Sequence, residues 1–360
     1  MQYDGGPLVT GAPGASGETD TWLRSGGRNG GGGTVGGMSV ARNQGIDVGT
    51  GARVLVGTCS WTDATLVKET DWYPKRSMTA AERLAYYAST FPVVEVDSTY
   101  YFPPTPELAA AWVERTPAHF TMDIKAWSLL TGHPTFPDSL WPDLQPEVPA
   151  EHRGKRRLYA KHLPPDVIDE AWDRFRHALG PLQAAGKLGA VLFQYPRWFG
   201  PREAHRAQIA DAVRRLEGIR VCVEFRHARW LEGGDCESTL SLLEDLGASF
   251  VCVDEPAGFP SSMPPVVAAT SSLAVVRFHG RNQATWEGPV PSAAERFRYL
   301  YTPDELAEWV PRIRDLAASA DDVHVLMNNC WRDYAVVNAA QIADLLQVPP
   351  PASEALTADA

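Results

Sequence analysis

Eight short strand-like runs that alternate with helix-like segments constrain the fold of this chain more than any other feature. The strand-like runs span residues 54–58, 93–99, 120–126, 189–195, 219–226, 249–254, 273–279 and 323–328. Helix-like segments span residues 79–90, 105–114, 165–185, 201–216, 236–246 and 302–318, and residues 338–346 form another after the last strand. The sequence Thr302-Pro303-Asp304-Glu305 is typical of a helix start, because it combines a capping threonine, an early proline and first-turn acids. Eight strands joined by crossovers predict an α/β fold with one (β/α)8 TIM-type barrel, which needs about 250 residues.

The predicted barrel domain spans residues 52–348. Residues 1–51 are rich in glycine and serine, with a glycine run at 30–33 and no periodic apolar pattern, so we expect a disordered leader there. Residues 349–360 are expected to form a disordered tail. A surplus after the third strand, residues 128–164, has many prolines and a basic run at 153–157. We interpret this surplus as a loop inserted on the active face of the barrel.

The composition limits the partners that this chain can have. A net charge of -11 opposes general binding to nucleic acid, which depends mostly on phosphate neutralisation, so any phosphate recognition must be local. No run of 18 apolar residues occurs, so no membrane span is expected. The five cysteines form no Cys-x-x-Cys pair, which predicts free thiols in a reducing cytoplasm rather than a zinc ribbon or a disulfide framework.

Residues 273–281, LAVVRFHGR, place an unusual polar cluster at the end of an apolar strand. Apolar residues alternate there with Val275, Arg277 and His279, and Arg281 follows one glycine later. Burying Arg277 or His279 without a partner would cost several kcal/mol, roughly, so other strands must supply partners.

The same alternation predicts which residues face the barrel axis, because the outer side of each strand must be apolar to meet the helices. By this rule each strand ends in an inward polar group. The predicted inward residues are Thr58, Ser60, Glu95, Asp97, Asp123, Lys125, Gln194, Cys222, Glu224, Arg226, Asp254, Arg277, His279 and Asn328. Barrel enzymes carry their sites at this carboxyl-terminal end, so we predict a functional site there.

A structural role competes with this interpretation for the deepest residues. Glu95 and Arg277 can neutralise each other inside the barrel, which is how buried charges are tolerated. Glu224, Asp254 and His279 lie nearer the mouth, where a function is favoured.

Tryptophans also follow the strand ends and suit stacking on a sugar or a nucleobase, although each can equally anchor a loop. They are Trp61, Trp127, Trp198, Trp230, Trp286 and Trp331.

Several of these motifs together resemble one known family. They are GTCSW at 57–61, EVDSTYY at 95–101, FQYP at 193–196, EFRH at 224–227, RFHGR at 277–281, YLY at 299–301 and Asn328-Asn329. In this order they are similar to the YecE-like family, also called domain of unknown function 72, over nearly all of residues 53–346. The resemblance implies a TIM-type barrel in a bacterial cytosolic protein and implies no activity. Cys59, Asp97 and Cys330 depart from the residues commoner in that family, and Cys330 weakens any metal site that needs a histidine there.

Three functions fit the predicted ring. In the first, an enzyme of hydrolase, isomerase or lyase type acts on an anionic, phosphorylated small molecule or nucleic-acid fragment. Its expected catalytic residues are Glu224, His279, Asp254 and Lys125. Its expected substrate-binding residues are Arg277, Arg281, Arg226, Glu95, Asp97, Gln194, Asn328, Asn329, Trp61 and Trp230.

The second function is metal-dependent hydrolysis or isomerisation, with a divalent ion on Glu224, Asp254 and His279. No other cofactor is expected. The third is a barrel that binds a ligand or a partner without catalysis. Retaining glycoside hydrolysis is disfavoured, because the fourth and seventh strands end in Gln194 and His279 rather than in two carboxylates.

Overall fold

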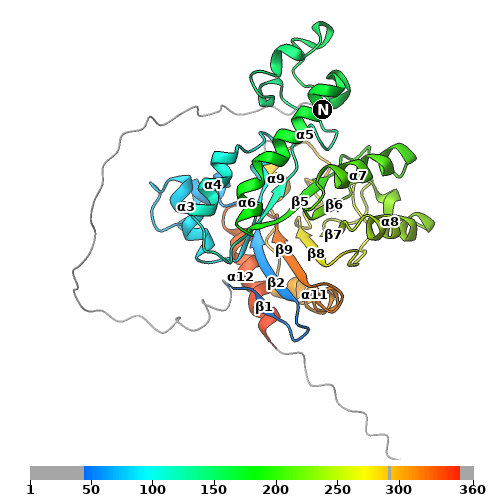
Figure 1. The fold of residues 1–360 in the computed structure, drawn as a ribbon. Coiled ribbons are helices and arrows are strands. Elements are labelled where there is room, and N and C mark those ends of the chain that lie inside the picture. Colours follow the sequence, from blue (N-terminus) through cyan, green and yellow to red (C-terminus); the bar gives the residue numbers. More distant parts are fainter. Residues whose placement is uncertain (1–43, 291–292, 349–360) are drawn as a thin grey trace, which may run out of the picture. The chain divides into compact units, whose positions relative to one another are not determined.

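The computed structural model describes residues 44–290 and 293–348, and it closes eight parallel strands into a barrel (Figure 1). The strands are β2 (Arg53–Thr58), β3 (Val93–Val96), β4 (Thr121–Lys125), β5 (Leu188–Gln194), β6 (Val221–Glu224), β7 (Ser249–Asp254), β8 (Leu273–Phe278) and β9 (Asp322–Met327). Each strand pairs in parallel with the next along the chain, and β9 pairs with β2 to close the sheet. The predicted (β/α)8 barrel is therefore confirmed.

Helices follow the strands and surround the barrel. They are α2 (Ala64–Glu69), α3 (Ala80–Ala88), α4 (Pro106–Glu114), α5 (Pro165–Ala178), α6 (Gly180–Ala184), α7 (Glu203–Arg215), α8 (Gly234–Asp245), α9 (Ala293–Arg296), α10 (Pro303–Ala307), α11 (Trp309–Ala317) and α12 (Tyr334–Gln347). The predicted helices at 165–185 and 302–318 are each divided in two. Pro181 and Pro311 lack the amide hydrogen that would bond to the carbonyl four residues earlier, so neither helix continues unbroken.

Capping fixes the start of two of these helices. Thr302 accepts a hydrogen bond from the backbone of Glu305, whose carboxylate accepts one from the backbone of Thr302, so the predicted start of α10 is confirmed. Thr79 and Glu82 form the same reciprocal cap on α3.

The barrel interior is closely packed, and its strands are buried on both faces. β2 and β3 approach so closely at Gly57 that a Cβ there would lie 2.0 Å from the Val93 carbonyl oxygen. Deeper in the barrel, His324 Nδ1 lies 2.8 Å from Asp123 Oδ2, and both side chains are buried. The interior therefore holds a polar layer below the strand ends.

Most of the expected leader and all of the expected tail lie outside the described residues. These are residues 1–43 of the leader and residues 349–360 of the tail. Residues 44–51, also assigned to the disordered leader, include strand β1 (Ile46–Asp47), which pairs antiparallel with β2. That part of the expectation is wrong, because Ile46 is buried against the core and the strand extends the sheet.

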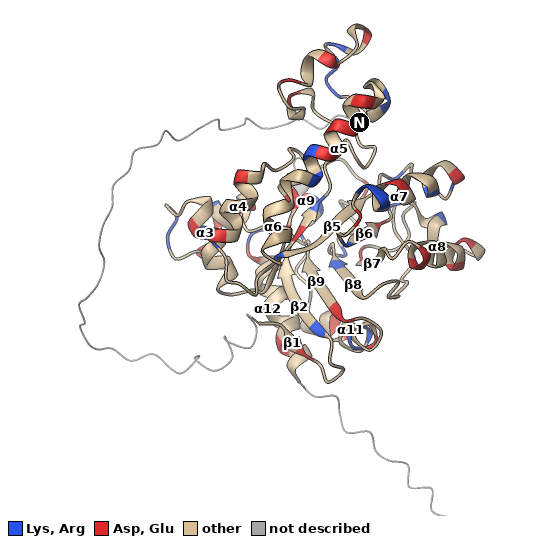
Figure 2. Ribbon diagram, in the orientation of Figure 1, with Lys and Arg blue, Asp and Glu red and all other residues tan. Residues whose placement is uncertain are grey.

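The predicted insertion lies between β4 and α5 and is green in Figure 1. It contains four short 3-10 helices, and Thr135 pairs antiparallel with Leu158 across it. Figure 2 shows that most charged residues lie on the helices and loops around the barrel, while the strands are mostly uncharged. No helix among the described residues is long and apolar enough to cross a membrane.

Candidate functional site

The innermost cation at the strand ends is Arg277 on β8, and it is bound to two carboxylates. Its Nε and Nη2 donate to Glu95 on β3 at 2.8 and 2.7 Å, and its Nη1 donates to Glu224 on β6. Cys59 lies beside them, with its Sγ 3.4 Å from Glu95 Oε2. The three charged side chains have 0% exposure, so Arg277 is fully engaged inside the barrel.

A second guanidinium lies one layer nearer the mouth. Arg226, two residues after β6, places Nη2 2.7 Å from Glu224 Oε1 and donates from Nη1 to Glu255 at 2.6 Å. Burial raises the pKa of Glu224, but Arg226 and Arg277 outweigh that effect and hold the pKa well below its ordinary value. Glu224 is therefore an anion between two cations rather than an acid able to give up a proton.

His279 is fully buried beside this pair, and both of its ring nitrogens are engaged. Arg226 Nη2 lies 3.0 Å from Nε2, and Glu224 Oε1 lies 3.3 Å from the same nitrogen. Asn328 Nδ2 lies 2.8 Å from Nδ1. Burial, together with Arg226, lowers the pKa of His279 to about 3, so the imidazole is neutral.

Lys125 and Asp97 lie at the mouth and are less confined. Lys125 ends β4, and its Nζ lies 5.2 Å from the centroid of the Tyr100 ring. Burial and the charge of Arg277 lower the pKa of the Lys125 amine. Burial raises the pKa of Asp97 to about 6, although Lys125 opposes that shift. The mouth thus combines an amine whose pKa is lowered with a carboxyl whose pKa is about 6. Gln194 and Asn328 are partly exposed beside it.

Asp254 does not face the barrel axis, which corrects the prediction. Its carboxylate accepts hydrogen bonds from Tyr301 at 2.7 Å and from Trp309 Nε1 on α11 at 2.7 Å, and from Arg281. Phe278 of β8, its register partner, also packs on Trp309, so both residues face the helical layer. Since β7 is buried on both sides, the apolar pattern did not distinguish its two faces.

Arg281 and Asn329 are likewise held outside the mouth. Arg281 forms ion pairs with Asp254, Glu305 and Glu308, which leaves little of its charge for a substrate anion. Asn329 is buried and donates to the Tyr299 carbonyl and to Asn338 of α12. The expected contribution of these two residues to substrate binding does not fit their positions.

The two tryptophans expected to bind substrate are buried in the loops. Trp230 has no exposed surface, stacks on Phe225 with ring centroids 4.5 Å apart, and donates to the Phe199 carbonyl at 2.5 Å. Trp61 donates to the Ala80 carbonyl and packs edge-on against Trp112. Both therefore anchor loops to the barrel and offer no indole face to a ligand.

The proposed metal ligands do not converge. Asp254 faces outward, whereas Glu224 and His279 face inward and are already bound to Arg226. Within residues 44–290 and 293–348, no three His, Cys, Asp or Glu side chains are placed to hold a metal ion. The donor set expected from the sequence thus does not fit a divalent cation.

Some inward residues were missed. Cys59, not Thr58, faces the axis from the first strand, since Thr58 donates to the Tyr87 hydroxyl on α3 at 3.0 Å. Glu255 is nearly buried, and burial raises its pKa to about 7. Apolar residues occupy both faces of β2, so its alternation did not show that Cys59 faces the axis. His133, in the insertion, gave no periodic signal.

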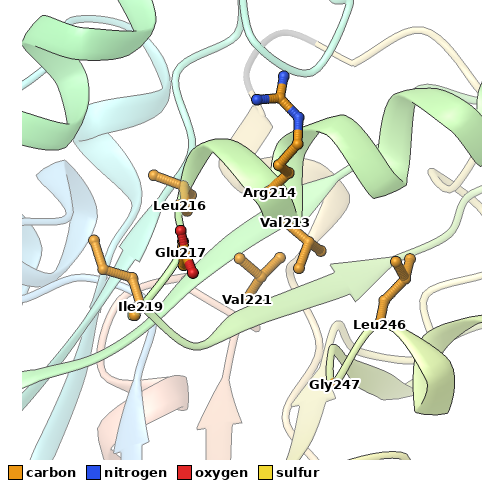
Figure 3. A pocket seen from close by; sticks show the side chains of 9 residues that line it. Val213, Arg214, Leu216, Glu217, Ile219, Val221, Leu246 and Gly247 are labelled. Atoms are coloured by element: carbon orange, nitrogen blue, oxygen red, sulfur yellow. The ribbon is translucent and has the colours of Figure 1, made fainter.

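A hollow at the other end of the barrel carries no comparable chemistry (Figure 3). It lies before β6 and β7, and its lining is mostly apolar, with Arg214 and Glu217 as its charged members. This end of the strands is opposite the polar ring.

The comparisons with known proteins agree on one family. A family model described as "Protein of unknown function DUF72" matches residues 55–358. The UPF0759 protein YunF of Bacillus subtilis is 29% identical over 299 residues, which cover 82% of this chain and 95% of that protein.

Solved structures of DUF72 family proteins are also similar. One from Enterococcus faecalis is 25% identical, with a TM-score of 0.66, over 83% of this chain and 97% of that chain. Another, from Thermotoga maritima, is 26% identical, with a TM-score of 0.64, over 82% of this chain and 99% of that chain.

Proposed function

Because the chain belongs to the DUF72 family of proteins of unknown function, its chemistry has to be inferred from its own site, and we propose an enzyme of lyase or isomerase type. In this proposal Lys125 is the reacting group. Its amine forms an imine with a small aldehyde or ketone bound at the carboxyl-terminal mouth of the barrel, where TIM-barrel enzymes hold their substrates.

The observation that carries the proposal is that the Lys125 amine contacts the Tyr100 ring but no acceptor atom of the described residues. Across residues 44–290 and 293–348, the structure gives this amine neither a hydrogen bond nor a salt bridge. Lys187 offers the contrast within the same chain, because its buried Nζ donates to Val113, to the Thr116 carbonyl and to the Thr116 hydroxyl at 2.7–2.9 Å. A structural lysine is satisfied in this way, whereas Lys125 is left available for reaction.

The environment of Lys125 favours the nucleophilic form. A lysine reacts with a carbonyl only when its amine is unprotonated, and both burial and Arg277 lower the pKa of Lys125. Asp97, beside it, has a pKa raised to about 6 and can hold a proton for transfer to the substrate oxygen.

The step is a condensation that needs no redox partner. The Lys125 nitrogen adds to the carbonyl carbon, the carbonyl π bond breaks, and one amine proton moves to oxygen. The carbon–oxygen bond of this carbinolamine then breaks, and water leaves with a second proton, from the carbinolamine nitrogen. The resulting imine withdraws electrons and weakens the bonds of the adjacent carbon.

Two unpartnered donors support an anionic group on the substrate. Arg226 Nε and Trp286 Nε1 are buried without a hydrogen-bond partner among the described residues, and the Arg226 guanidinium lies 5.4 Å from the Trp286 ring centroid. Buried donors are normally satisfied, so these two favour a carboxylate or phosphate acceptor. Arg226 also binds two carboxylates, but all three guanidinium nitrogens of Arg277 and of Arg281 already donate to carboxylates, so those two residues are less suited.

Borohydride trapping tests the proposal. The purified protein is incubated with pyruvate, glycolaldehyde phosphate or acetaldehyde, reduced with sodium borohydride and digested for peptide mass mapping. We expect a covalent adduct on Lys125, with more adduct from the two anionic compounds than from acetaldehyde. Lys125→Arg keeps the positive charge but should abolish the adduct, whereas Lys75→Arg on the surface should not.

Three outcomes separate the other interpretations. An adduct that persists in Lys125→Arg, or the absence of any adduct, would contradict imine chemistry. Loss of the adduct on adding EDTA would favour a metal-dependent enzyme. Binding of the anionic compounds without an adduct, detected as a raised melting temperature, would favour a binding protein without catalysis.

A further inference from the structure

The insertion after β4 holds one histidine, His133, in a fixed position. The backbone amide of His133 donates to the Ser128 carbonyl at 3.0 Å. Two residues later, Thr135 pairs with Leu158 across the insertion through two 2.8 Å backbone hydrogen bonds. The segment that carries His133 is therefore tied at both ends.

A neighbouring hydroxyl contacts this imidazole. Thr131 Oγ1 lies 3.1 Å from the Ser128 carbonyl oxygen and 2.8 Å from His133 Nδ1. We assign the hydroxyl hydrogen to the carbonyl, so that the oxygen accepts from Nδ1–H and Nε2 carries the lone pair. No residue in the described part of the chain hydrogen-bonds to Nε2, and the side chain is partly exposed.

The imidazole and the Lys125 amine contact the same aromatic ring. The His133 ring is perpendicular to Tyr100, with an interplanar angle of 79° and centroids 5.3 Å apart. The same Tyr100 ring lies 5.2 Å from Lys125 Nζ. Burial, with smaller contributions from Lys125 and Arg226, lowers the pKa of His133 to about 3, so the imidazole is neutral.

We propose that His133 is a catalytic residue that carries protons between the Lys125 amine and the substrate oxygen. The inference rests on the proposed function, which it deepens by naming the acid–base partner. Nε2 accepts the proton that the nitrogen loses when it adds to the carbonyl. The imidazolium so formed returns this proton to the oxygen, and after a second proton passes from nitrogen to oxygen, the leaving group is water. No net proton is gained or lost by the histidine.

His279 is less suited to this role. It has no exposed surface, and both of its ring nitrogens already contact side chains, Nε2 that of Arg226 and Nδ1 that of Asn328. A weakly basic imidazole such as His133 is protonated only briefly, and its protonated form is a strong acid towards a departing hydroxyl.

The test follows the rate of adduct formation with pyruvate, measured by borohydride quenching at successive times. Removing a proton-transfer residue typically costs 10²–10⁴-fold in rate. We expect His133→Gln to slow adduct formation by at least about tenfold without changing the final yield, since a catalyst leaves the equilibrium unchanged. Added imidazole should restore part of the rate. His152→Gln, in the same insertion, should react like the parent protein.

Thr131→Val keeps the imidazole but removes the acceptor for Nδ1–H. We expect slower adduct formation in this variant, and a loss of the unprotonated Nε2 signal of His133 in ¹⁵N NMR spectra. An unchanged rate in His133→Gln, with the adduct still lost in Lys125→Arg, would overturn the role of His133 alone. An adduct retained in Lys125→Arg would overturn the proposed function itself.

Discussion

Arg277 is the residue on which the buried charge of the site depends. Two carboxylates, Glu95 and Glu224, bind it inside the barrel, and none of the three side chains is exposed. An ion pair of this kind adds little net stability, because desolvation offsets the attraction, yet removing one partner leaves the others without compensation. We therefore assign Arg277 a structural role below the reacting groups.

This role predicts a large loss of stability in Arg277→Met. Two carboxylates would remain buried without their cation, so the free energy of unfolding should fall by about 3–5 kcal/mol. Arg174→Met is the matched control, because Arg174 also binds two carboxylates, those of Asp143 and Glu170, but at the surface. It should cost less than about 1 kcal/mol. Urea denaturation followed by tryptophan fluorescence measures both. Equal, small losses would mean that Arg277 is free to serve as a ligand.

The sequence predicted which charged residues lie at the strand ends better than it predicted which way their side chains face. The alternation in β8 and β6 correctly gave Arg277, His279 and Glu224 as inward residues. It failed for Asp254, because apolar residues occupy both faces of β7 and a polar residue at the strand end can be satisfied outside the barrel. No periodic pattern could show that His133, in the insertion after β4, contacts the same Tyr100 ring as Lys125 at the end of that strand.

Strand β5 shows how one small residue allows two elements to approach. A Cβ on Gly189 would lie 2.1 Å from Asp123 Oδ1 and 2.6 Å from Thr121 Cγ2, both on β4. Asp123 in turn contacts His324 on β9 across the barrel. The glycine thus leaves the room that the buried Asp123–His324 layer needs.

Gly189→Ala should therefore destabilise the barrel. The added methyl group must displace a buried carboxylate, and overpacking of a core typically costs about 1–3 kcal/mol. Gly180→Ala is the control, because no atom lies within 4 Å of its Cβ position in α6. It should be neutral or stabilising, since alanine is the better helix former. Thermal unfolding distinguishes the two variants, and an unchanged melting temperature in Gly189→Ala would contradict the close packing.

The order of elements was predictable because each strand and helix has its own local period. The ends of these elements were less predictable. The strand predicted over residues 93–99 stops at Val96, and Asp97–Tyr100 form a 3-10 helix at the mouth. The paths within the insertion and the pairing of β1 with β2 depend on contacts between distant residues, such as Thr135 with Leu158, which no local period encodes.

Across the whole molecule, burial at the mouth shifts four titrating groups in ways that oppose one another. Burial lowers the pKa of His133 and of His279 from 6.5 to about 3, so the unfolded chain binds more protons there and stability falls as pH decreases below 6.5. Burial raises the pKa of Asp97 from 3.8 to about 6 and that of Glu255 from 4.5 to about 7. At these carboxyls the folded chain binds more protons, so stability falls as pH rises.

Between about pH 4.5 and 6 the two histidines and the two carboxyls nearly cancel, so these four groups should give the parent protein a free energy of unfolding almost independent of pH. In Asp97→Asn the folded state loses the proton that Asp97 binds in this window. Relative to the parent, the free energy of unfolding should therefore increase as pH rises, by up to about 1.4 kcal/mol per pH unit. In His133→Gln the unfolded state loses the proton that His133 binds in this window. Relative to the parent, the free energy of unfolding should therefore decrease as pH rises, at a similar rate. Urea midpoints across this window, compared with the parent protein at each pH, give the slopes directly. Opposite slopes are expected because desolvation favours the neutral form of each group, whereas slopes near zero in both variants would show that the mouth is as well hydrated as the surface.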